Sequence, residues 1–254
     1  MKKLVLTSLL AVFAATGANA AINDNPLYRP DQGRFYSVTS LESGSKSSNE
    51  YALTEEFGYG VTDRLAIGLA TSLSESDWFD AAGWNTFGIG VDYRVFDGAN
   101  WKADVFGSYG FDGVWPYGET FLGKDNTWYQ WTVGATVGYE ASSWAVAGHI
   151  AFDYANSESF NWGDDGRHML RAGADAFFDM NESWALILGA EYQIGLDDDN
   201  ERGTWLGKLG VNYNIDDAKF IGAYVGKEMV HEEAAGSWDI RDGFAYGVKF
   251  GVEF

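Results

Sequence analysis

The chain has 254 residues, no cysteine and a net charge of −20 at pH 7. The acidic balance excludes nucleic acid as a partner, because phosphate groups would be repelled, and the missing cysteines exclude disulfide bonds. Aromatic residues make up 17% of the chain and glycine contributes 32 residues, but proline contributes only three, as is typical of strands, because proline cannot donate to a strand ladder.

Residues 1–20 are predicted to be a cleaved signal peptide. Two lysines precede an apolar run over residues 4–15, and Ala18-Asn19-Ala20 has the small-x-small pattern of a cleavage site. We therefore expect the mature chain to begin at Ala21. The apolar run is too short for a stop-transfer helix, and no later run is long enough to span a membrane as a helix. A membrane protein of this kind would have to be a closed β-barrel, because lipid cannot satisfy a free sheet edge.

Residues 21–33, which contain Pro26 and Pro30, are predicted to form a short periplasmic lead-in. From Gly33 onward apolar residues alternate with polar or small ones, and this period of two indicates β-strands. The twelve predicted runs are roughly 34–42, 50–61, 64–74, 85–95, 100–111, 127–139, 144–154, 168–178, 184–194, 204–214, 218–229 and 243–254. The first, eighth and eleventh of these runs alternate least clearly, so a barrel of ten strands is an alternative to one of twelve.

Short and long connections alternate along these runs. Such alternation is typical of an antiparallel up-and-down barrel in an outer membrane, with short turns in the periplasm and long loops outside. We therefore expect residues 34–254 to form one transmembrane β-barrel, an all-β fold. The short turns are predicted at 62–64, 96–99, 140–143, 179–183 and 216–217, and the long loops at 43–49, 74–84, 112–126, 155–167, 195–203 and 230–242.

Aromatic residues stand near both ends of several runs, for example Tyr129 and Tyr139, with aliphatic residues between them. Two aromatic girdles around an apolar band are expected where a barrel meets the two lipid interfaces. The aromatic pairs that follow this pattern are Tyr129 and Tyr139, Trp144 and Tyr154, Trp184 and Tyr192, and Trp205 and Tyr213.

The last run alternates without a break to the final residue, with Phe244, Tyr246, Val248, Phe250, Val252 and Phe254 on one face. Here the sequence resembles the Gram-negative outer-membrane β-barrel proteins of the porin-like and transporter-like class, whose last strand ends in an aromatic residue, usually Phe. The resemblance implies a location in the bacterial outer membrane. It also implies that Phe250, Val252 and Phe254 form an assembly signal read by the barrel-assembly machinery.

The polar faces of the runs are expected to line the barrel interior. A lumen of charged and small residues can hold water and pass solutes, but the acids and bases could also pair across the lumen and close it. The candidate lining residues are Glu56, Asp92, Arg94, Lys102, Asp104, His149, Asp153, Arg171, Asp175, Glu191, Gln193, Lys208, Asn212 and Lys249.

The predicted outer loops are acidic. The last five long loops contain 17 Asp or Glu and 4 Lys or Arg, and the densest acidic run holds Asp197, Asp198, Asp199 and Glu201. Such a mouth would concentrate cations. The run lacks the glycine of an EF-hand loop, so we expect no dedicated calcium site. We expect divalent cations to bridge this surface to lipopolysaccharide.

These features predict a channel for passive diffusion of small hydrophilic or amphipathic solutes, with a preference for cations. One alternative is a structural or adhesive barrel with a closed lumen. Another is a surface hydrolase of the omptin or phospholipase type, for which His168 beside Asp164 and Asp165, and His231 before Glu232, are the candidate groupings. No G-x-S-x-G or H-E-x-x-H motif is present. The sequence therefore predicts no catalytic residue, cofactor or metal site.

Overall fold

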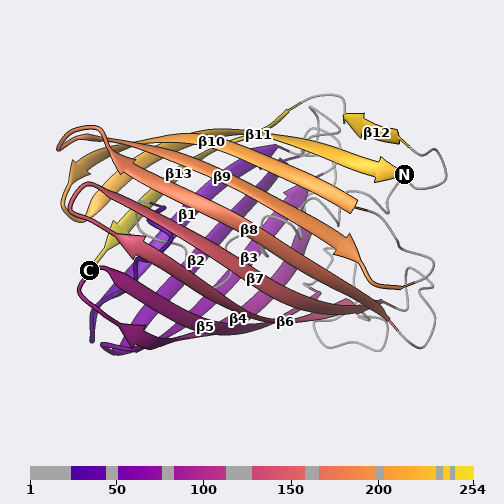
Figure 1. The fold of residues 1–254 in the computed structure, drawn as a ribbon, viewed down its shortest axis with the longest axis horizontal. Coiled ribbons are helices and arrows are strands. Elements are labelled where there is room, and N and C mark those ends of the chain that lie inside the picture. The colour runs from indigo at the N-terminus through magenta and orange to yellow at the C-terminus, as the bar shows by residue number, and fades with distance from the viewer. Residues whose placement is uncertain are drawn as a thin grey trace.

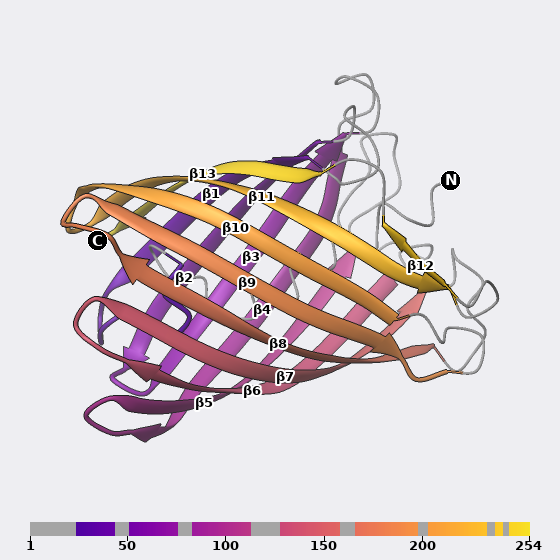
Figure 2. The same cartoon turned by 45° about the horizontal axis from the view of Figure 1, so that its top comes forward.

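The computed structural model describes residues 24–43, 51–75, 83–112, 128–157, 166–197, 203–232, 237–240 and 244–254. These residues form one antiparallel sheet that closes on itself (Figures 1 and 2). Strand β1 (Phe35–Ser43) pairs with β2 (Tyr51–Thr62) and with β13 (Ala245–Glu253), so the first and last strands close the barrel. Strand β11 (Lys219–Glu232) pairs with β10 (Gly203–Asp216) and with β13, which leaves no edge in the ring.

The wall has twelve strands, as the sequence predicts, and each lies within a few residues of its predicted run. The additional short strand β12 (Ser237–Ile240) was not predicted; it pairs with Met229–Glu232, where β11 extends past its pairing with β13. The wall strands not yet given are β3 (Leu65–Glu75), β4 (Gly83–Asp97), β5 (Trp101–Asp112), β6 (Trp128–Glu140), β7 (Trp144–Ser157), β8 (Arg167–Asp179) and β9 (Trp184–Gly195).

All short connections meet at one end of the barrel, which we call the short-turn end; the C-terminus lies there as well (Figure 1). Side chains common in turns shape these connections. Thr62 Oγ1 accepts hydrogen bonds from the backbone N–H groups of Arg64 and Leu65, and Asn181 Oδ1 does the same for Ser183 and Trp184. The predicted alternation of short and long connections is confirmed. The opposite end is the long-loop end.

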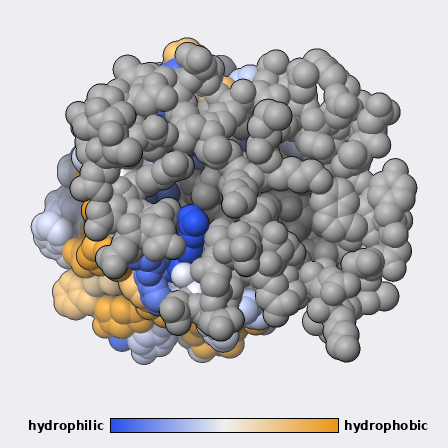
Figure 3. Space-filling view, turned by 90° about the vertical axis from the view of Figure 1, so that its right-hand side faces the viewer, coloured by the Kyte–Doolittle hydropathy of each residue, from blue (hydrophilic) through white to orange (hydrophobic). Residues whose placement is uncertain are grey.

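The outer face of the wall is an apolar belt. Alternation places Leu69 and Val133 outward, and each is 58% exposed. A soluble protein would bury such a surface, whereas a barrel in lipid presents it to acyl chains. Viewed from the long-loop end, hydrophobic residues gather on the visible lower part of the outer wall, and hydrophilic residues show in the central opening (Figure 3). Among the described residues no helix is long and apolar enough to cross a membrane.

Aromatic rings gather at both rims of this belt. Near the short-turn end Phe35 and Tyr59 have ring centroids 4.4 Å apart, and Trp184 and Tyr213 are 4.9 Å apart. Near the long-loop end Tyr109 lies 4.5 Å from Trp131, and Tyr192 lies 4.9 Å from Trp205. The two girdles expected from the sequence are therefore present, and they mark the two lipid interfaces.

One carboxylate stands in the belt. Glu55 faces outward on β2, midway along the strand between the outward-facing Tyr51 and Tyr59. Its two oxygens accept hydrogen bonds from the hydroxyls of Ser37 and Thr39, each at 2.5 Å. A charged group on the lipid-facing wall is unfavourable, and these neighbouring hydroxyls on β1 compensate part of that desolvation.

Candidate functional site: the barrel lumen

The predicted lining residues all lie on the inner face of the wall strands. Most are buried: Asp92, Asp104 and Asp153 are each 1% exposed, and Arg171 is fully buried. The structure therefore brings these charges into contact with one another rather than leaving them in open water. Apart from Glu56, they form two groups, one on β7 to β9 and one toward the short-turn end.

Arg171 organises the first group. Its guanidinium donates to Asp153 from Nε at 2.5 Å and from Nη2 at 3.1 Å, and from Nη1 to Glu191 at 3.3 Å. Asp153 also accepts from Thr132 at 2.6 Å and from Gln130 at 3.1 Å. A buried ion pair is stable only when its remaining hydrogen-bonding groups are satisfied in this way.

His149 extends this group toward β8 and β9. Its Nε2 lies 2.9 Å from a carboxylate oxygen of Glu191, and its Nδ1 lies 3.2 Å from Asp175. Glu191 also accepts from Gln193 at 2.6 Å. These partners sit on β7, β8 and β9, which are neighbours in the sheet. The contacts therefore run along the wall and do not cross the lumen.

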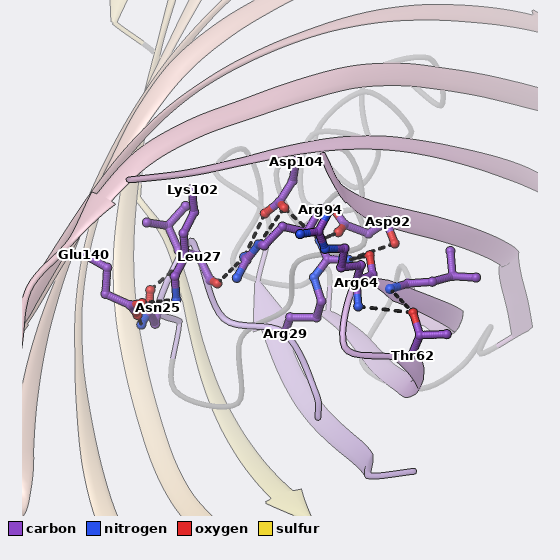
Figure 4. Close-up of polar contacts among 11 residues, drawn as sticks. Asn25, Leu27, Arg29, Thr62, Arg64, Asp92, Arg94, Lys102, Asp104 and Glu140 are labelled. Atoms are coloured by element: carbon purple, nitrogen blue, oxygen red, sulfur yellow. Dashed lines mark hydrogen bonds and ion pairs between the residues drawn. The ribbon is translucent and has the colours of Figure 1, made fainter. Parts of the chain in front are cut away.

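The second group surrounds an N-terminal segment that enters the barrel. Residues Asp24–Gly33, which we call the inner segment, precede β1 and lie inside the short-turn end. Figure 4 shows Arg29 of this segment pointing toward Asp92 and Asp104 on β4 and β5. The Arg29 guanidinium is ion-paired with Asp92 and lies 2.9 Å from Asp104. The sequence predicts a lead-in here but does not predict that it enters the lumen.

Arg94 ties the backbone of the inner segment to the same wall. It donates to both carboxylate oxygens of Asp104, at 2.9 and 3.0 Å, and to the carbonyl of Leu27 at 2.7 Å. Arg29 in turn donates to the carbonyls of Arg64 and Asp92, at 2.6 and 3.0 Å. Each guanidinium thus joins a carboxylate to a backbone carbonyl, which fixes both the position and the direction of the segment.

Asn25 contacts a different wall. Its amide donates to Glu140 at 2.7 Å, and Glu140 is also ion-paired with Lys102 (Figure 4). Lys102 and Glu140 come from the neighbouring strands β5 and β6. Lys102, a predicted lining residue, is therefore linked to the inner segment through Glu140. Glu140 was not among the predicted lining residues.

Asp24 contacts the opposite side of the barrel. Its carboxylate is ion-paired with Lys249, accepts from Asn212 at 3.1 Å and lies 3.8 Å from Lys208. Burial raises the pKa of Asp24, but the positive charges of Lys249 and Lys208 outweigh that effect and lower the pKa to about 2. The carboxylate is therefore charged at every physiological pH.

Apolar contacts hold the middle of the inner segment. Leu27, 1% exposed, packs with Ala145, Ala147, Phe177, Ala185 and Ile187, and Tyr28 packs against Tyr36, Val38 and Phe220. The Tyr28 hydroxyl also donates to Glu253 at 3.0 Å. Burial and the Glu253 charge raise the pKa of Tyr28, so the hydroxyl keeps its proton.

Two glycines make room for this packing. A Cβ on Gly60 would collide with the carbonyl oxygens of Pro30 and Asp31, and one on Gly138 would lie 2.9 Å from Leu27 Cδ1. Gly60 also pairs with the segment directly, because Gln32 forms a parallel bridge with it and its carbonyl accepts from Gly33 at 2.8 Å. The wall is thus built to accept the inner segment at close range.

The inner segment crosses the lumen from wall to wall. In the closed strand order β4 lies opposite β10, and β6 lies opposite β13. Arg29 binds β4 while Asp24 binds β10, and Asn25 binds β6 while Tyr28 binds β13. These polar contacts join opposite walls through the inner segment, and they lie toward the short-turn end.

At the long-loop end the predicted mouth charge is described only for Asp197. Asp198, Asp199 and Glu201 lie outside the described residues. Asp197 accepts from the backbone N–H of His168 at 2.6 Å and lies 2.8 Å from His168 Nδ1. Burial raises the pKa of Asp197, but these hydrogen bonds lower it below its usual value.

The acid and histidine groupings considered for a hydrolase lie partly outside the described residues. His168 contacts Asp197, while Asp164 and Asp165 lie outside the described ranges. The backbone of His231 pairs with Gly203 and Trp238, and its side chain is not described. Within the described parts of the chain no group of three or more His, Cys, Asp or Glu side chains could hold a metal ion.

The predicted assembly residues lie on the closing strand. Phe250 and Val252 face outward on β13, and Phe254 exchanges two backbone hydrogen bonds with Phe35, at 2.8 and 3.2 Å. The last residue therefore extends the seam between the first and last strands, and its ring is 64% exposed.

The closed strand ring, the apolar belt and the polar interior define an outer-membrane β-barrel. No family model matches the sequence, and no curated protein does. Solved structures share the fold. The KdgM porin has a TM-score of 0.59 at 8% identity, over 86% of this chain and 99% of that one.

Two further porin and channel structures are similar. The NanC porin has a TM-score of 0.57 at 10% identity, over 87% of this chain and 98% of that one. An outer membrane channel from Pseudomonas putida F1 has a TM-score of 0.52 at 13% identity, over 89% of this chain and 97% of that one. At these identities the likeness is one of fold.

Sequence reasoning missed Asp24, Asn25, Leu27, Tyr28 and Arg29. The available signal was indirect: the inner-face positions Ala145, Ala147 and Ala185, next to short turns, carry small side chains and leave room for another segment. Nothing in the pattern identifies the occupant of that room.

Proposed function

We propose that this chain is an outer-membrane channel through which small hydrophilic or amphipathic solutes diffuse passively, with a preference for cations. The observation that carries the proposal is the inner face of the barrel, where charged side chains pair along the wall between neighbouring strands. Pairing of this kind gives a polar surface without bridging the lumen. It differs from the closed arrangement in which acids and bases meet across the lumen.

The likeness to porin and channel folds supports the same proposal. The KdgM porin has been solved in complex with disordered oligogalacturonate, a hydrophilic molecule. For the present chain we propose the wider class of small hydrophilic or amphipathic solutes.

The proposed preference for cations rests on the acidic long loops, with 17 acids against 4 bases in the last five, and on the precursor's net charge of −20. Charges around a pore mouth change the local ion concentration, and a low-dielectric wall focuses their field. The effect extends over about a Debye length, about 10 Å at 0.1 M salt, so it should weaken as salt rises. The same surface is proposed to bind lipopolysaccharide through divalent cations.

The test is single-channel recording of the refolded protein in a planar bilayer with a salt gradient. A reversal potential of the sign expected for cations, shrinking at high salt, supports the proposal. Neutralising Asp197, Asp198, Asp199 and Glu201 together should reduce the preference and leave conductance in place. A preference for anions would contradict the cation assignment. Silence of the wild type and also of a variant whose N-terminal segment is released from the wall, both shown to be folded and inserted, would contradict the channel.

A structural or adhesive barrel with a closed lumen is the second candidate. The inner segment favours it, because residues 24–33 bind opposite walls at the short-turn end. Under that reading the segment would be a permanent part of the core, and no condition or substitution that loosens it would produce ion flow. No catalytic step is proposed for this chain.

A further inference from the structure

We infer that the inner segment is a displaceable plug: when seated it closes the short-turn end of the lumen, and the channel conducts when it withdraws. This inference rests on the proposed channel function. It assigns a role to residues 24–33, which the strand pattern leaves without one. It also places the control of flow at the end of the barrel opposite the acidic mouth.

The first argument is geometric. The contacts of the inner segment reach opposite pairs of strands within a short stretch of chain: β4 and β10 through Arg29 and Asp24, and β6 and β13 through Asn25 and Tyr28. Apart from Lys208, which lies near the middle of β10, the wall residues that bind Asp24, Asn25, Tyr28 and Arg29 lie near a short turn or near the C-terminus. The segment therefore lies across the lumen in one layer instead of running along one wall.

The second argument concerns how the segment is attached. It continues into β1 through Gly33, whose φ of +83° lies in the left-handed region that glycine adopts without strain. No covalent cross-link holds it elsewhere, because the chain has no cysteine. With cleavage after Ala20, as the sequence predicts, Asp24 would be the fourth residue of the mature chain (24 − 20 = 4). The plug would then be an arm fixed at one end only.

The third argument is the nature of the contacts. The wall strands are joined by continuous ladders of backbone hydrogen bonds, whereas the inner segment is held mainly by side chains. Asp24, Asn25 and Arg29 make separate polar contacts, each of which can exchange for water or for ions. A cluster of this kind can open locally while the barrel stays folded, because segments with few backbone hydrogen bonds open at lower free energy than core strands.

A reversible cross-link gives the decisive test. Because the chain has no native cysteine, only the introduced thiols can react with the reagent. Asn25→Cys and Glu140→Cys replace two side chains that touch at 2.7 Å, one on the plug and one on the wall. A short bis-methanethiosulfonate reagent joins the two thiols, and a reductant releases them. The matched control carries Asp216→Cys and Lys219→Cys, an exposed pair 2.9 Å apart on a short turn that does not touch the plug.

A release variant tests the opposite direction. Asp24→Lys places a cation beside Lys249 and Lys208 and replaces attraction with repulsion. Losing a charge-assisted hydrogen bond changes an equilibrium by about tenfold or more. We therefore expect the fraction of time spent open in planar-bilayer recordings to rise by at least about tenfold relative to the wild type. The different mobility of heated and unheated samples on a gel confirms that the variant is folded.

The expected result is that cross-linking the plug abolishes conductance, that reductant restores it, and that the same reagent leaves the control pair conducting. Unchanged conductance after complete cross-linking of the thiols introduced at positions 25 and 140 would overturn the plug and leave the channel function standing. A silent wild type with a conducting Asp24→Lys variant supports both proposals. Silence of every folded and inserted variant, the release variant included, overturns both.

Discussion

Removing Arg171 tests how dry the middle of the lumen is. The guanidinium is fully buried and donates to Asp153 through two nitrogens and to Glu191 through the third. Arg171→Met keeps most of the volume and removes the charge. Two carboxylates would then remain on β7 and β9 without the cation that faces both.

The expected loss of unfolding free energy follows from these contacts. Removing one partner of a buried ion pair destabilises a protein by about 3–5 kcal/mol. Here the carboxylates keep other donors: Asp153 keeps Thr132 and Gln130, and Glu191 keeps His149 and Gln193. The loss should therefore fall at the lower end of that range, about 3 kcal/mol.

The measurement is urea unfolding of the barrel refolded into lipid vesicles, followed by the fluorescence of its 11 tryptophans. If the unfolding free energies of the two proteins fall with urea concentration at the same slope, both proteins expose the same amount of surface on unfolding. Lys219→Met is the matched control, because Lys219 and Asp216 are 46% exposed and 2.9 Å apart on a short turn. An exposed pair contributes about 0–1 kcal/mol.

The result that would refute this reasoning is a loss of less than about 1 kcal/mol for Arg171→Met, similar to that of the control. Water would then replace the guanidinium at little cost, and the network would be a hydrated part of an open pathway. Arg171→Lys should fall between the wild type and the Met variant, because lysine keeps the charge but cannot bind Asp153 through two nitrogens.

Three further predictions concern the whole barrel. Epitope tags near Gly83, Gly163 or Gly236 should be accessible on intact cells, whereas tags near Gly98 or Ser143 should not; the reverse labelling would mean that the barrel is inverted in the membrane. Removing Phe254, or replacing it with a charged residue, should lower the folded yield in cells, measured by the gel mobility of unheated samples, and an unchanged yield would remove its proposed role as an assembly signal. The pKa of Asp24 is lowered from 3.8 to about 2, so its contact with Lys249 is complete above pH 3.8 and is lost as the pH falls through about 2. Conductance should therefore rise over this pH window in the wild type and not in Asp24→Asn. An equal rise in both proteins would assign the effect to other carboxyl groups.

The strands and their faces could be predicted from the sequence because both depend on local pattern. Alternation from Leu65 to Leu73 places each side chain inside or outside, and turn residues such as Thr62 and Asn181 mark where strands end. The pair of Arg94 and Asp104 also follows from pattern once the register is known, because these residues are direct cross-strand partners. The short strand β12 was missed because its pairing lies beyond the regular wall.

The inner segment could not be predicted, because its position depends on contacts between residues distant in sequence. Residues 21–33 contain Pro26 and Pro30 and show no period of two, so nothing local gives them a direction. Arg29 reaches Asp92, and Asp24 reaches Lys249, only because the ring closes and brings all of these strands around one space. The hydrogen bonds of Glu55 could not be predicted either. Alternation places its side chain on the outer face, but the β1–β2 register decides that Ser37 and Thr39 lie beside it.

The charges of the inner segment match the walls that it joins. Asp24 faces Lys249 and Lys208 on one side, and Arg29 faces Asp92 and Asp104 on the other. Asp24 and Arg29 carry opposite charges, so their departure together changes the net charge beside these two walls little; Asp31, the other charged residue of the segment, is exposed. Withdrawal instead uncovers cations on one wall and carboxylates on the opposite wall, and a low-dielectric barrel focuses the field between them. Selectivity by sign should therefore stay with the acidic mouth, while the uncovered layer orients solutes that carry separated charges.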